Sequence, residues 1–217
     1  MDHPLVMLAG SVLLGYLLGA LNPAALVARI KHANLREQNT KNLGATNTML
    51  TFGLRWGILV LIVDMGKAIC AVLLASHLFP DFPEAGLIAG GAAVCGHIFP
   101  FYLGFRGGKG LAPFLGMILA YDPPVFVLLL FIGIVLALVF NYSAAMPLSI
   151  APLFPVAVWL RTKNGFCVVA AVATSLLVLI KHWGNLRRAM RREDNRVRQY
   201  IAEHWIRRPP RDGGGGN

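Results

Sequence analysis

Long apolar stretches place the strongest constraint on how this chain can fold. A helix that crosses the hydrocarbon core of a bilayer, about 30 Å thick, needs about 20 mostly apolar residues. Seven apolar stretches follow one another along the sequence: residues 5–30, 54–79, 85–105, 111–121, 125–140, 146–160 and 166–180. Only 14% of the residues are charged, which excludes an ordinary soluble domain because such domains carry about 25%. The sequence therefore predicts an all-α integral membrane protein with about seven transmembrane helices, of which the fourth and sixth are short.

The basic residues indicate the orientation of the chain, because lysine and arginine favour the cytoplasmic side of a membrane. Residues 181–217 hold 10 of the 20 basic residues and 4 of the 10 acidic ones, so the C-terminus is expected to be cytoplasmic. Seven crossings then place the N-terminus outside, where residues 1–4 contain no lysine or arginine. Segments 31–52 and 104–110 fall on the cytoplasmic side and carry further basic residues, whereas the basic segment 161–163 falls outside, against the rule.

The chain divides into three segments by composition. Residues 1–182 form the predicted transmembrane domain, and its first apolar stretch is too long for a cleavable signal peptide. Residues 183–206 combine arginines with apolar residues spaced mostly four apart, which predicts a basic amphipathic helix on the anionic cytoplasmic leaflet. Residues 207–217 are rich in glycine, arginine and proline and are expected to be disordered. This tail favours membrane lipids as its partner, not nucleic acid.

A glycine-rich loop on the expected cytoplasmic side is the clearest candidate for ligand binding. Gly107, Gly108 and Gly110 flank Lys109, and Arg106 precedes them. Glycines let the backbone approach a ligand closely, and successive N–H groups beside a lysine form an anion site. The N-terminus of the helix expected after this loop adds to that site. The pattern is not a Walker A loop, because Gly110 stands where that loop has serine or threonine.

Two further polar clusters lie on the same expected side of the membrane. Residues 39–47 combine hydroxyl and amide side chains around one glycine, and these groups suit phosphate and hydroxyl oxygens. His182, Asn185 and Arg188 follow at intervals of three and share one face of a helix. For each cluster taken alone, an ordinary polar loop or a lipid-facing helix end is the simple alternative.

Three ionisable residues lie well inside the apolar stretches, away from their ends, where such groups are costly and tend to pair or to face a site. Asp64 and Lys67, three positions apart, are predicted to form an ion pair. His97 lies just before the glycine-rich loop and could serve as general base, as proton acceptor or as donor to an oxyanion. The three cysteines stand singly and no Cys/His spacing fits zinc, so neither a metal nor another cofactor is expected.

Taken together, the polar clusters resemble the motifs of the bacterial acyl-phosphate:glycerol-3-phosphate acyltransferases, the PlsY-type family. The matching residues are Gly96-His97-x-Phe99-Pro100, Phe105-Arg106-Gly107-Gly108-Lys109-Gly110, Asn42-Leu43-Gly44-Ala45-Thr46-Asn47 and His182-x-x-Asn185-x-x-Arg188. Asp64 and Lys67 also look like a family position, and the resemblance covers residues 15–195. The long motif around the glycine-rich loop is the most specific part of it.

The resemblance implies a seven-helix enzyme of the bacterial plasma (inner) membrane with its site on the cytoplasmic face. It implies transfer of a fatty acyl group from acyl phosphate to the 1-hydroxyl of sn-glycerol 3-phosphate, giving lysophosphatidate and phosphate at the start of phospholipid synthesis. The implied catalytic residues are His97, Asn185 and Thr40. The implied phosphate-binding and substrate-binding residues are Arg36, Asn42, Thr46, Asn47, Arg106, Gly107, Gly108, Lys109, Gly110, Ser143, His182 and Arg188.

The chemistry of that reaction agrees with the residues independently of the resemblance. An acyl phosphate is a mixed anhydride with a good leaving group, so no serine or cysteine nucleophile is required. The site must hold the hydroxyl against the carbonyl, neutralise charge and remove a proton. Consistent with this, the chain has no Gly-x-Ser-x-Gly nucleophile motif.

The chain departs from the family pattern at several polar positions. Thr40 replaces a serine, Leu50 stands where an arginine usually follows, and Ala144 takes a serine position next to Ser143. Two alternative functions therefore stay open: a divergent paralogue with little or no catalysis, and an organophosphate or anion transporter. No pattern in the sequence indicates the acyl-chain preference or the oligomeric state.

Overall fold

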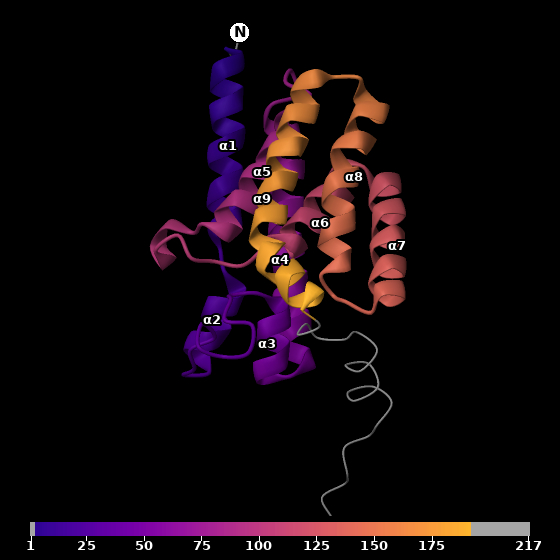
Figure 1. Cartoon of the computed structure of the whole chain (residues 1–217). Helices are drawn as coiled ribbons and strands as arrows, with labels where there is room; N and C mark the ends of the chain where they lie inside the picture. Colours follow the sequence, from indigo (N-terminus) through magenta and orange to yellow (C-terminus); the bar gives the residue numbers. More distant parts are fainter. Residues whose placement is uncertain (1–2, 192–217) are drawn as a thin grey trace, which may run out of the picture.

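The computed structural model describes residues 3–191 as a bundle of long helices with a group of short helices at one end (Figure 1). The helices of this part are α1 (Pro4–Ala20), α2 (Pro23–Ile30), α3 (Ala45–Phe52), α4 (Leu54–Leu78), α5 (Ala85–Ile98), α6 (Leu111–Tyr121), α7 (Pro123–Phe140), α8 (Ala145–Thr162) and α9 (Gly165–Met190). The 3-10 turn η1 (Phe101–Leu103) lies between α5 and the glycine-rich loop.

Within residues 3–191, six helical segments are long and apolar enough to cross a membrane. They are Pro4–Ile30, Leu54–Leu78, Ala85–Leu103, Pro123–Phe140, Ala145–Thr162 and Gly165–Arg188. The predicted all-α integral membrane class is thereby confirmed. α6 has 11 residues, or roughly 16 Å of helix, which is shorter than the hydrocarbon core, as expected for the fourth stretch. The sixth stretch is longer than expected, because α8 extends to 18 residues.

The first apolar stretch is divided into two helices at Leu21 and Asn22. Pro23 begins α2, because proline suits the first turn of a helix, where no backbone N–H is needed. Asn22 caps this helix by accepting a hydrogen bond at Oδ1 from the Ala25 N–H, at 2.8 Å. The break leaves the carbonyl oxygen of Leu21 available to a side chain, and Lys67 Nζ donates to it at 2.6 Å.

Small residues bring α1 and α5 into close contact. A Cβ added at Gly15 would lie 2.1 Å from the carbonyl oxygen of Ala89, and one at Gly19 would lie 2.1 Å from that of Ala93. Pairs of small residues four apart let helix backbones approach each other in membranes, where van der Waals packing drives association. Only glycine allows this distance, so the two residues determine how closely α5 lies against α1.

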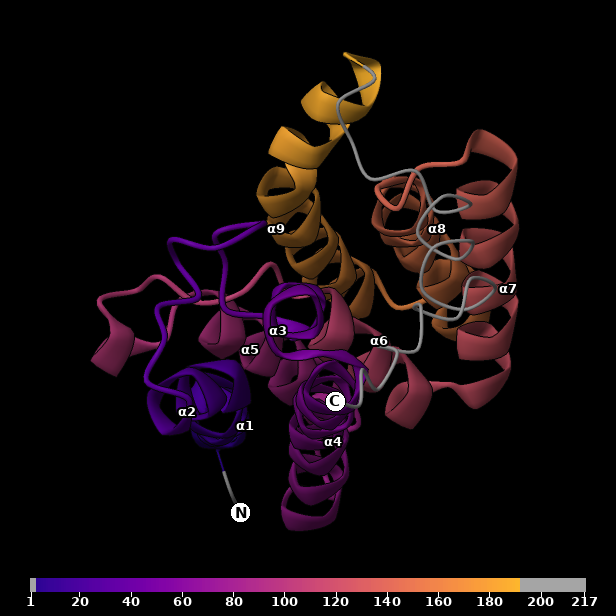
Figure 2. The ribbon, with the colours of Figure 1, turned by 90° about the horizontal axis from the view of Figure 1, so that it is seen from below.

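α5 is the most buried of the membrane-spanning segments in the described part. In its apolar window 61% of the residues are buried, against 39% or less in the others. The end-on view shows α5 surrounded by other helices, and it contacts α1, α4, α6 and α9 (Figure 2). A side chain on the last turn of α5, such as His97, therefore lies in the interior of the bundle, at 2% exposure.

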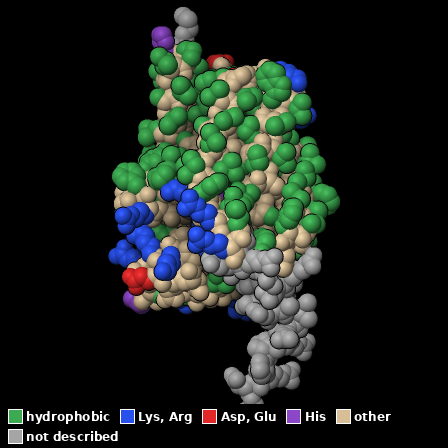
Figure 3. Space-filling model, viewed as in Figure 1, with side chains coloured by type: hydrophobic (Ala, Val, Ile, Leu, Met, Phe, Trp, Pro, Cys, Tyr) green, Lys and Arg blue, Asp and Glu red, His purple; other side chains and the backbone are tan. Residues whose placement is uncertain are grey.

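Polar and basic groups gather at one end of the bundle. α2, α3 and the C-terminal end of α9 lie together at the lower end (Figure 1), and lysine and arginine side chains cluster on the lower part of a surface that is mostly hydrophobic above (Figure 3). Arg161, which departs from the basic-residue rule, belongs to an ion pair instead. Its Nε donates to Asp122 Oδ2 at 2.7 Å and so links α8 to the turn before α7.

The predicted boundary between the transmembrane domain and the amphipathic helix does not coincide with a break in the chain. α9 runs continuously through residues 182 and 183 to Met190. Most of the predicted amphipathic helix, residues 192–206, and the whole predicted tail, residues 207–217, lie outside the described residues.

We expect Gly19→Ala to destabilise the protein, because the new methyl group must push α1 and α5 apart. Overpacking of this kind costs about 1–3 kcal/mol. Gly66→Ala is the matched control, since Gly66 lies in α4 and a Cβ there has no neighbouring atom within 4 Å. Thermal unfolding in detergent checks this; an equal midpoint for Gly19→Ala and wild type would contradict the close contact.

Candidate active site

A cavity of ≈ 520 Å³ lies at the basic end of the bundle. Its polar lining comes from the three motifs, from α4 and from the turn before α8: Thr40, Asn42, Gly44, Thr46, Asp64, His97, Lys109, Gly110, Ser143, His182, Asn185 and Arg188. Its apolar lining comes from α4, α6, α7 and α8: Leu61, Met65, Leu111, Leu115, Phe126, Leu130, Met146 and Pro147. One ligand in this cavity would therefore meet both a cationic, hydrogen-bonding wall and an apolar wall.

The loop before α3 is held in place by the fully buried amide of Asn47. Its Oδ1 accepts from the Thr40 N–H at 3.0 Å, and its Nδ2 donates to the carbonyl oxygens of Leu35 and Asn42 at 2.6 and 2.8 Å. Thr40 Oγ1 donates in turn to Asn42 Oδ1 at 2.5 Å. Thr40 and Asn42 line the cavity as a result, whereas Asn47 supports them from behind.

The glycine-rich loop folds back onto the end of α5. Gly107 N–H donates to the carbonyl oxygen of Ile98 at 3.0 Å, and Gly108 N–H donates to that of His97 at 3.2 Å. A Cβ at Gly108 would lie 2.1 Å from His97 Nε2 and 2.8 Å from the Leu43 carbonyl oxygen, so only glycine fits there. These two N–H groups are engaged within the protein, and the loop contributes Lys109 and Gly110 to the cavity instead.

Arg36 joins two polar loops at the protein surface. Its Nη2 donates to the carbonyl oxygens of Leu103 and Arg106, at 3.0 and 2.6 Å. Neither Arg36 nor the Arg106 side chain belongs to the cavity lining. In this structure Arg36 therefore positions the loop that carries Lys109.

α9 brings the third motif to the glycine-rich loop. Asn185 Oδ1 accepts from Lys109 Nζ and from Arg188 Nη2, both at 2.6 Å. His182 is buried, and its Nδ1 lies 2.9 Å from the Val178 carbonyl oxygen, which can only accept a hydrogen bond. Nδ1 therefore carries a proton. The amide, two cations and an imidazole converge on one side of the cavity.

Asp64, Lys67 and His97 form a buried cluster between α4 and α5. Lys67 Nζ lies 2.8 Å from Asp64 Oδ1 and 2.9 Å from His97 Nδ1. Asp64 Oδ1 and His97 Nδ1 are 3.1 Å apart. The three residues are only 1%, 6% and 2% exposed, in the order Asp64, Lys67 and His97. The predicted ion pair of Asp64 and Lys67 is confirmed. Sequence reasoning did not connect His97 to it, because the two segments are 30 residues apart and only the packing of α4 on α5 joins them.

The structure gathers ten of the fifteen predicted site residues in the cavity lining: Thr40, Asn42, Thr46, His97, Lys109, Gly110, Ser143, His182, Asn185 and Arg188. The other five lie outside it and hold the loops that form it: Arg36, Asn47, Arg106, Gly107 and Gly108. Sequence reasoning missed the apolar wall and Asp64 as cavity residues. The only signal for Asp64 was its charge within an apolar stretch.

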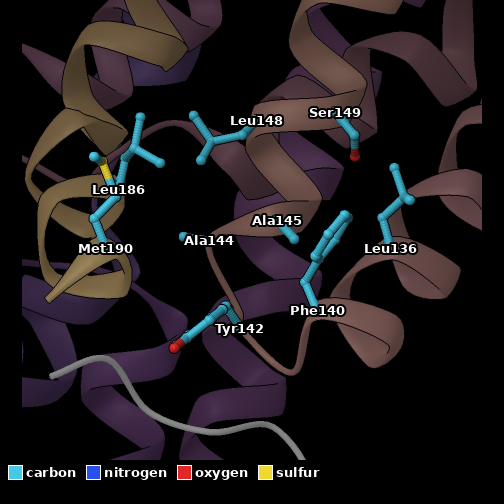
Figure 4. Close-up of a pocket in the computed structure, with 9 residues that line it drawn as sticks. All are labelled: Leu136, Phe140, Tyr142, Ala144, Ala145, Leu148, Ser149, Leu186 and Met190. Carbon is cyan, nitrogen blue, oxygen red and sulfur yellow. The ribbon is translucent and has the colours of Figure 1, made fainter. Parts of the chain in front are cut away.

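A second, smaller hollow of ≈ 380 Å³ lies beside the cavity, between the ends of α7, α8 and α9 (Figure 4). Figure 4 shows Phe140 and Leu148 pointing into it, and Leu186 facing Leu148 from α9. Ala144, which takes a family serine position, is 1% exposed and lines this hollow, whereas the adjacent Ser143 lines the main cavity. The turn before α8 therefore contributes Ala144 to the smaller hollow and Ser143 to the main cavity.

Fold and cavity together define the class: a multi-pass helical membrane protein with a pocket at one end of the bundle, lined by Lys109 and Arg188 and by apolar side chains. The glycerol-3-phosphate acyltransferase family model matches residues 9–192. The chain belongs to this family. A glycerol-3-phosphate acyltransferase of Methylococcus capsulatus is 36% identical over 183 residues, covering 84% of this chain and 92% of the relative. A glycerol-3-phosphate acyltransferase of Rhodospirillum rubrum is 37% identical over 204 residues, covering 89% of this chain and 93% of the relative.

Solved structures show the same architecture. The crystal structure of PlsY (YgiH), an integral membrane glycerol 3-phosphate acyltransferase, in its glycerol 3-phosphate form, superposes with a TM-score of 0.83. The match covers 91% of this chain and 98% of that one at 25% sequence identity. The lysophosphatidic acid form of the same protein gives a TM-score of 0.77 at 25% identity, and the match covers 87% of this chain and 94% of that one.

Removing one member of the buried ion pair is expected to cost more than removing both. Asp64→Leu leaves an ammonium group buried without its carboxylate, and Lys67→Met leaves the carboxylate, each costing about 3–5 kcal/mol. The double substitution leaves no uncompensated charge and should cost less than the sum of the two. A double-mutant cycle of unfolding free energies in detergent measures this coupling; strictly additive losses would show that the pair is not coupled in the folded protein.

Proposed function

We propose that this protein is a membrane acyltransferase that moves a fatty acyl group from acyl phosphate to the 1-hydroxyl of sn-glycerol 3-phosphate. The products are 1-acyl-glycerol 3-phosphate and inorganic phosphate. The observation that carries the proposal is the cavity with two walls, where Lys109, Asn185 and Arg188 face a lining of Phe126 and Leu130. A phosphorylated substrate with an acyl chain needs this combination, and the related PlsY was crystallised in glycerol 3-phosphate and lysophosphatidic acid forms.

The proposed reaction needs no covalent enzyme intermediate. The glycerol oxygen forms a bond to the acyl carbon while the bond from that carbon to the phosphate oxygen breaks. The hydroxyl proton leaves with the products, so acyl phosphate dianion and glycerol 3-phosphate give the ester and hydrogen phosphate. The protein must hold two anions close together and stabilise charge on the carbonyl oxygen, which is a matter of positioning and electrostatics.

We assign the roles of the cavity residues from their contacts. Lys109 and Arg188 supply positive charge to the phosphate groups, and Asn185, which accepts from both, holds them together. Thr40 and His97 lie on the cavity lining, and we assign them to orienting the hydroxyl and the carbonyl. The remaining implied binding residues on the lining contribute further hydrogen bonds: Asn42, Thr46, Gly110, Ser143 and His182.

We further propose that the cavity faces the cytoplasm of a bacterial plasma membrane, with the N-terminus outside. Half of the basic residues follow residue 180, and the lower, basic end in Figure 3 is the end that holds the cavity. The polar lining of the cavity lies at one end of the bundle, which favours an enzyme over a transporter. A transport path would need polar groups along the depth of the membrane and at its other face.

We expect Lys109→Met to lower acyltransferase activity about 100-fold, since one charged donor to the substrate is lost. The assay measures lysophosphatidate formed by purified protein from acyl phosphate and glycerol 3-phosphate, with acyl-CoA as the comparison donor. Lys163→Met is the matched control, because Lys163 lies over Trp159 at the opposite end of the bundle. That variant should keep the activity of wild type.

The alternatives give different results in the same preparation. A wild-type protein that forms no product but is stabilised against heat by glycerol 3-phosphate would be a paralogue that binds without catalysis. Uptake of glycerol 3-phosphate into proteoliposomes, again without product, would identify a transporter. Either outcome would overturn the proposed acyltransferase.

Enlarging a side chain of the apolar wall should shorten the acyl chain that the enzyme prefers. Leu130→Trp narrows the cavity beside Phe126, so we expect activity with a sixteen-carbon acyl phosphate to fall at least ten times more than activity with an eight-carbon one. Leu148→Trp is the matched control, because Leu148 lines the smaller hollow and not the main cavity. Equal losses for both chain lengths, or the larger shift in Leu148→Trp, would contradict the assignment of the wall to the acyl chain.

A further inference from the structure

We propose that Lys67 is a positioning residue that holds His97 in one tautomer, with Nδ1 accepting a hydrogen bond and Nε2–H donating one into the cavity. His97 then acts on the substrate as a hydrogen-bond donor and not as a general base. The assignment rests on the proposed acyltransferase function for its catalytic meaning. The tautomer itself follows from the contacts of the protein alone.

The first step concerns the three hydrogen atoms of the Lys67 ammonium group. Lys67 Nζ has three acceptors within hydrogen-bonding distance: the Leu21 carbonyl oxygen at 2.6 Å, Asp64 Oδ1 at 2.8 Å and His97 Nδ1 at 2.9 Å. An ammonium group has three N–H bonds and no lone pair, so each acceptor receives one bond. The Asp64 carboxylate, 2.8 Å from Nζ, pairs with this group as an ammonium ion.

The second step concerns the His97 ring. A lysine ammonium group can only donate, so a hydrogen bond across the 2.9 Å contact needs a lone pair on Nδ1. A neutral imidazole has one N–H, which must then be on Nε2. The carboxylate of Asp64 also lies 3.1 Å from Nδ1. We assign the hydrogen bond of Nδ1 to Lys67 instead, because Nζ lies closer to both atoms, at 2.8 and 2.9 Å.

The third step concerns the place that Nε2 faces. His97 lines the cavity together with Lys109, and its Nε2 lies against the glycine-rich loop at Gly108. A donor on that edge of the ring faces the region where two phosphorylated substrates would meet. Neutral N–H donors of this kind stabilise negative charge that develops on an oxygen during acyl transfer. A ring that already has its proton on Nε2 presents no lone pair there to accept the glycerol proton.

The cluster also explains why a lysine lies buried at this point. α1 supplies a backbone carbonyl where its helix ends, α4 supplies the carboxylate and α5 supplies the imidazole. An aspartate–histidine pair without the lysine would place the proton on Nδ1, since Nδ1 would then have Asp64 Oδ1, an acceptor, as its remaining partner. Lys67 therefore reverses the tautomer that Asp64 alone would impose.

Nitrogen-15 NMR of the substrate-free protein tests the tautomer directly. The protein carries six histidines, and the His97 signals are identified by their loss in His97→Gln. We expect Nε2 to carry the proton and Nδ1 to lack one. A proton on Nδ1, or on both nitrogens, would overturn the proposal. Lys67→Met should move the proton to Nδ1, provided that the variant folds; an unchanged tautomer in the folded variant would also overturn it.

Two substitutions of His97 test the donor role in activity and do not depend on Lys67. His97→Gln places an amide N–H near the position of Nε2, whereas His97→Asn reaches only as far as Nδ1 and serves as the matched control. We expect kcat of His97→Gln to stay within 10-fold of wild type and that of His97→Asn to fall about 100-fold. Equal and large losses in both variants would show that a base, not a donor, is needed.

The outcomes separate this inference from the proposed function. If wild type forms no lysophosphatidate while the NMR spectrum shows the proton on Nε2, only the proposed reaction fails. If wild type is active and the proton lies on Nδ1, only the role of Lys67 fails.

Discussion

The ammonium group of Lys67 is the charge around which the interior of this protein is arranged. An unpaired ammonium group in an apolar bundle is very costly, so its position requires acceptors on every side. Here those acceptors are the Leu21 carbonyl oxygen, Asp64 and His97, which come from three different segments. Satisfying one charge therefore fixes the end of α1, the register of α4 and the rotation of α5 relative to one another. The position of His97 follows from this requirement.

Close packing of helix backbones makes that arrangement possible. Gly15 and Gly19 let α1 approach α5, and Gly108 lets the glycine-rich loop lie against the His97 ring. A methyl group at any of these positions would move one of the groups that meet at the cavity. These glycines thus serve the site by allowing close contact between protein segments. In this structure the N–H groups of Gly107 and Gly108 donate to the carbonyl oxygens of Ile98 and His97 at the end of α5 and do not point into an open anion site.

The cavity brings polar and apolar side chains of the chain together in one place. Charged and amide side chains of the loops and α9 form one wall, and apolar side chains of α4, α6, α7 and α8 form the other. Each wall is an ordinary consequence of its location: the polar one lies at the basic end of the bundle and the apolar one continues the membrane-spanning helices. Their meeting point is suited to a substrate that has a phosphate group and an acyl chain. This is the physical basis of the proposed acyltransferase.

Periodicity, apolar length and local motifs were enough to predict a helical membrane protein, the short α6, the Asp64–Lys67 pair and most of the polar residues on the cavity lining. These features depend on residues close together in the chain, where helix geometry converts spacing into contact. The sequence did not show that His97 shares a hydrogen bond with Lys67, that Arg36 and Asn47 hold loops from outside the cavity, or that Leu130 faces its interior. Those facts depend on tertiary contacts. The packing of α1, α4 and α5 brings Lys67 to His97, whereas loop contacts decide the places of Arg36 and Asn47 and the position of α7 decides that of Leu130. The sequence determined which groups are present at the site; the tertiary structure decided which of them touch, because those contacts join segments that are separate in the chain.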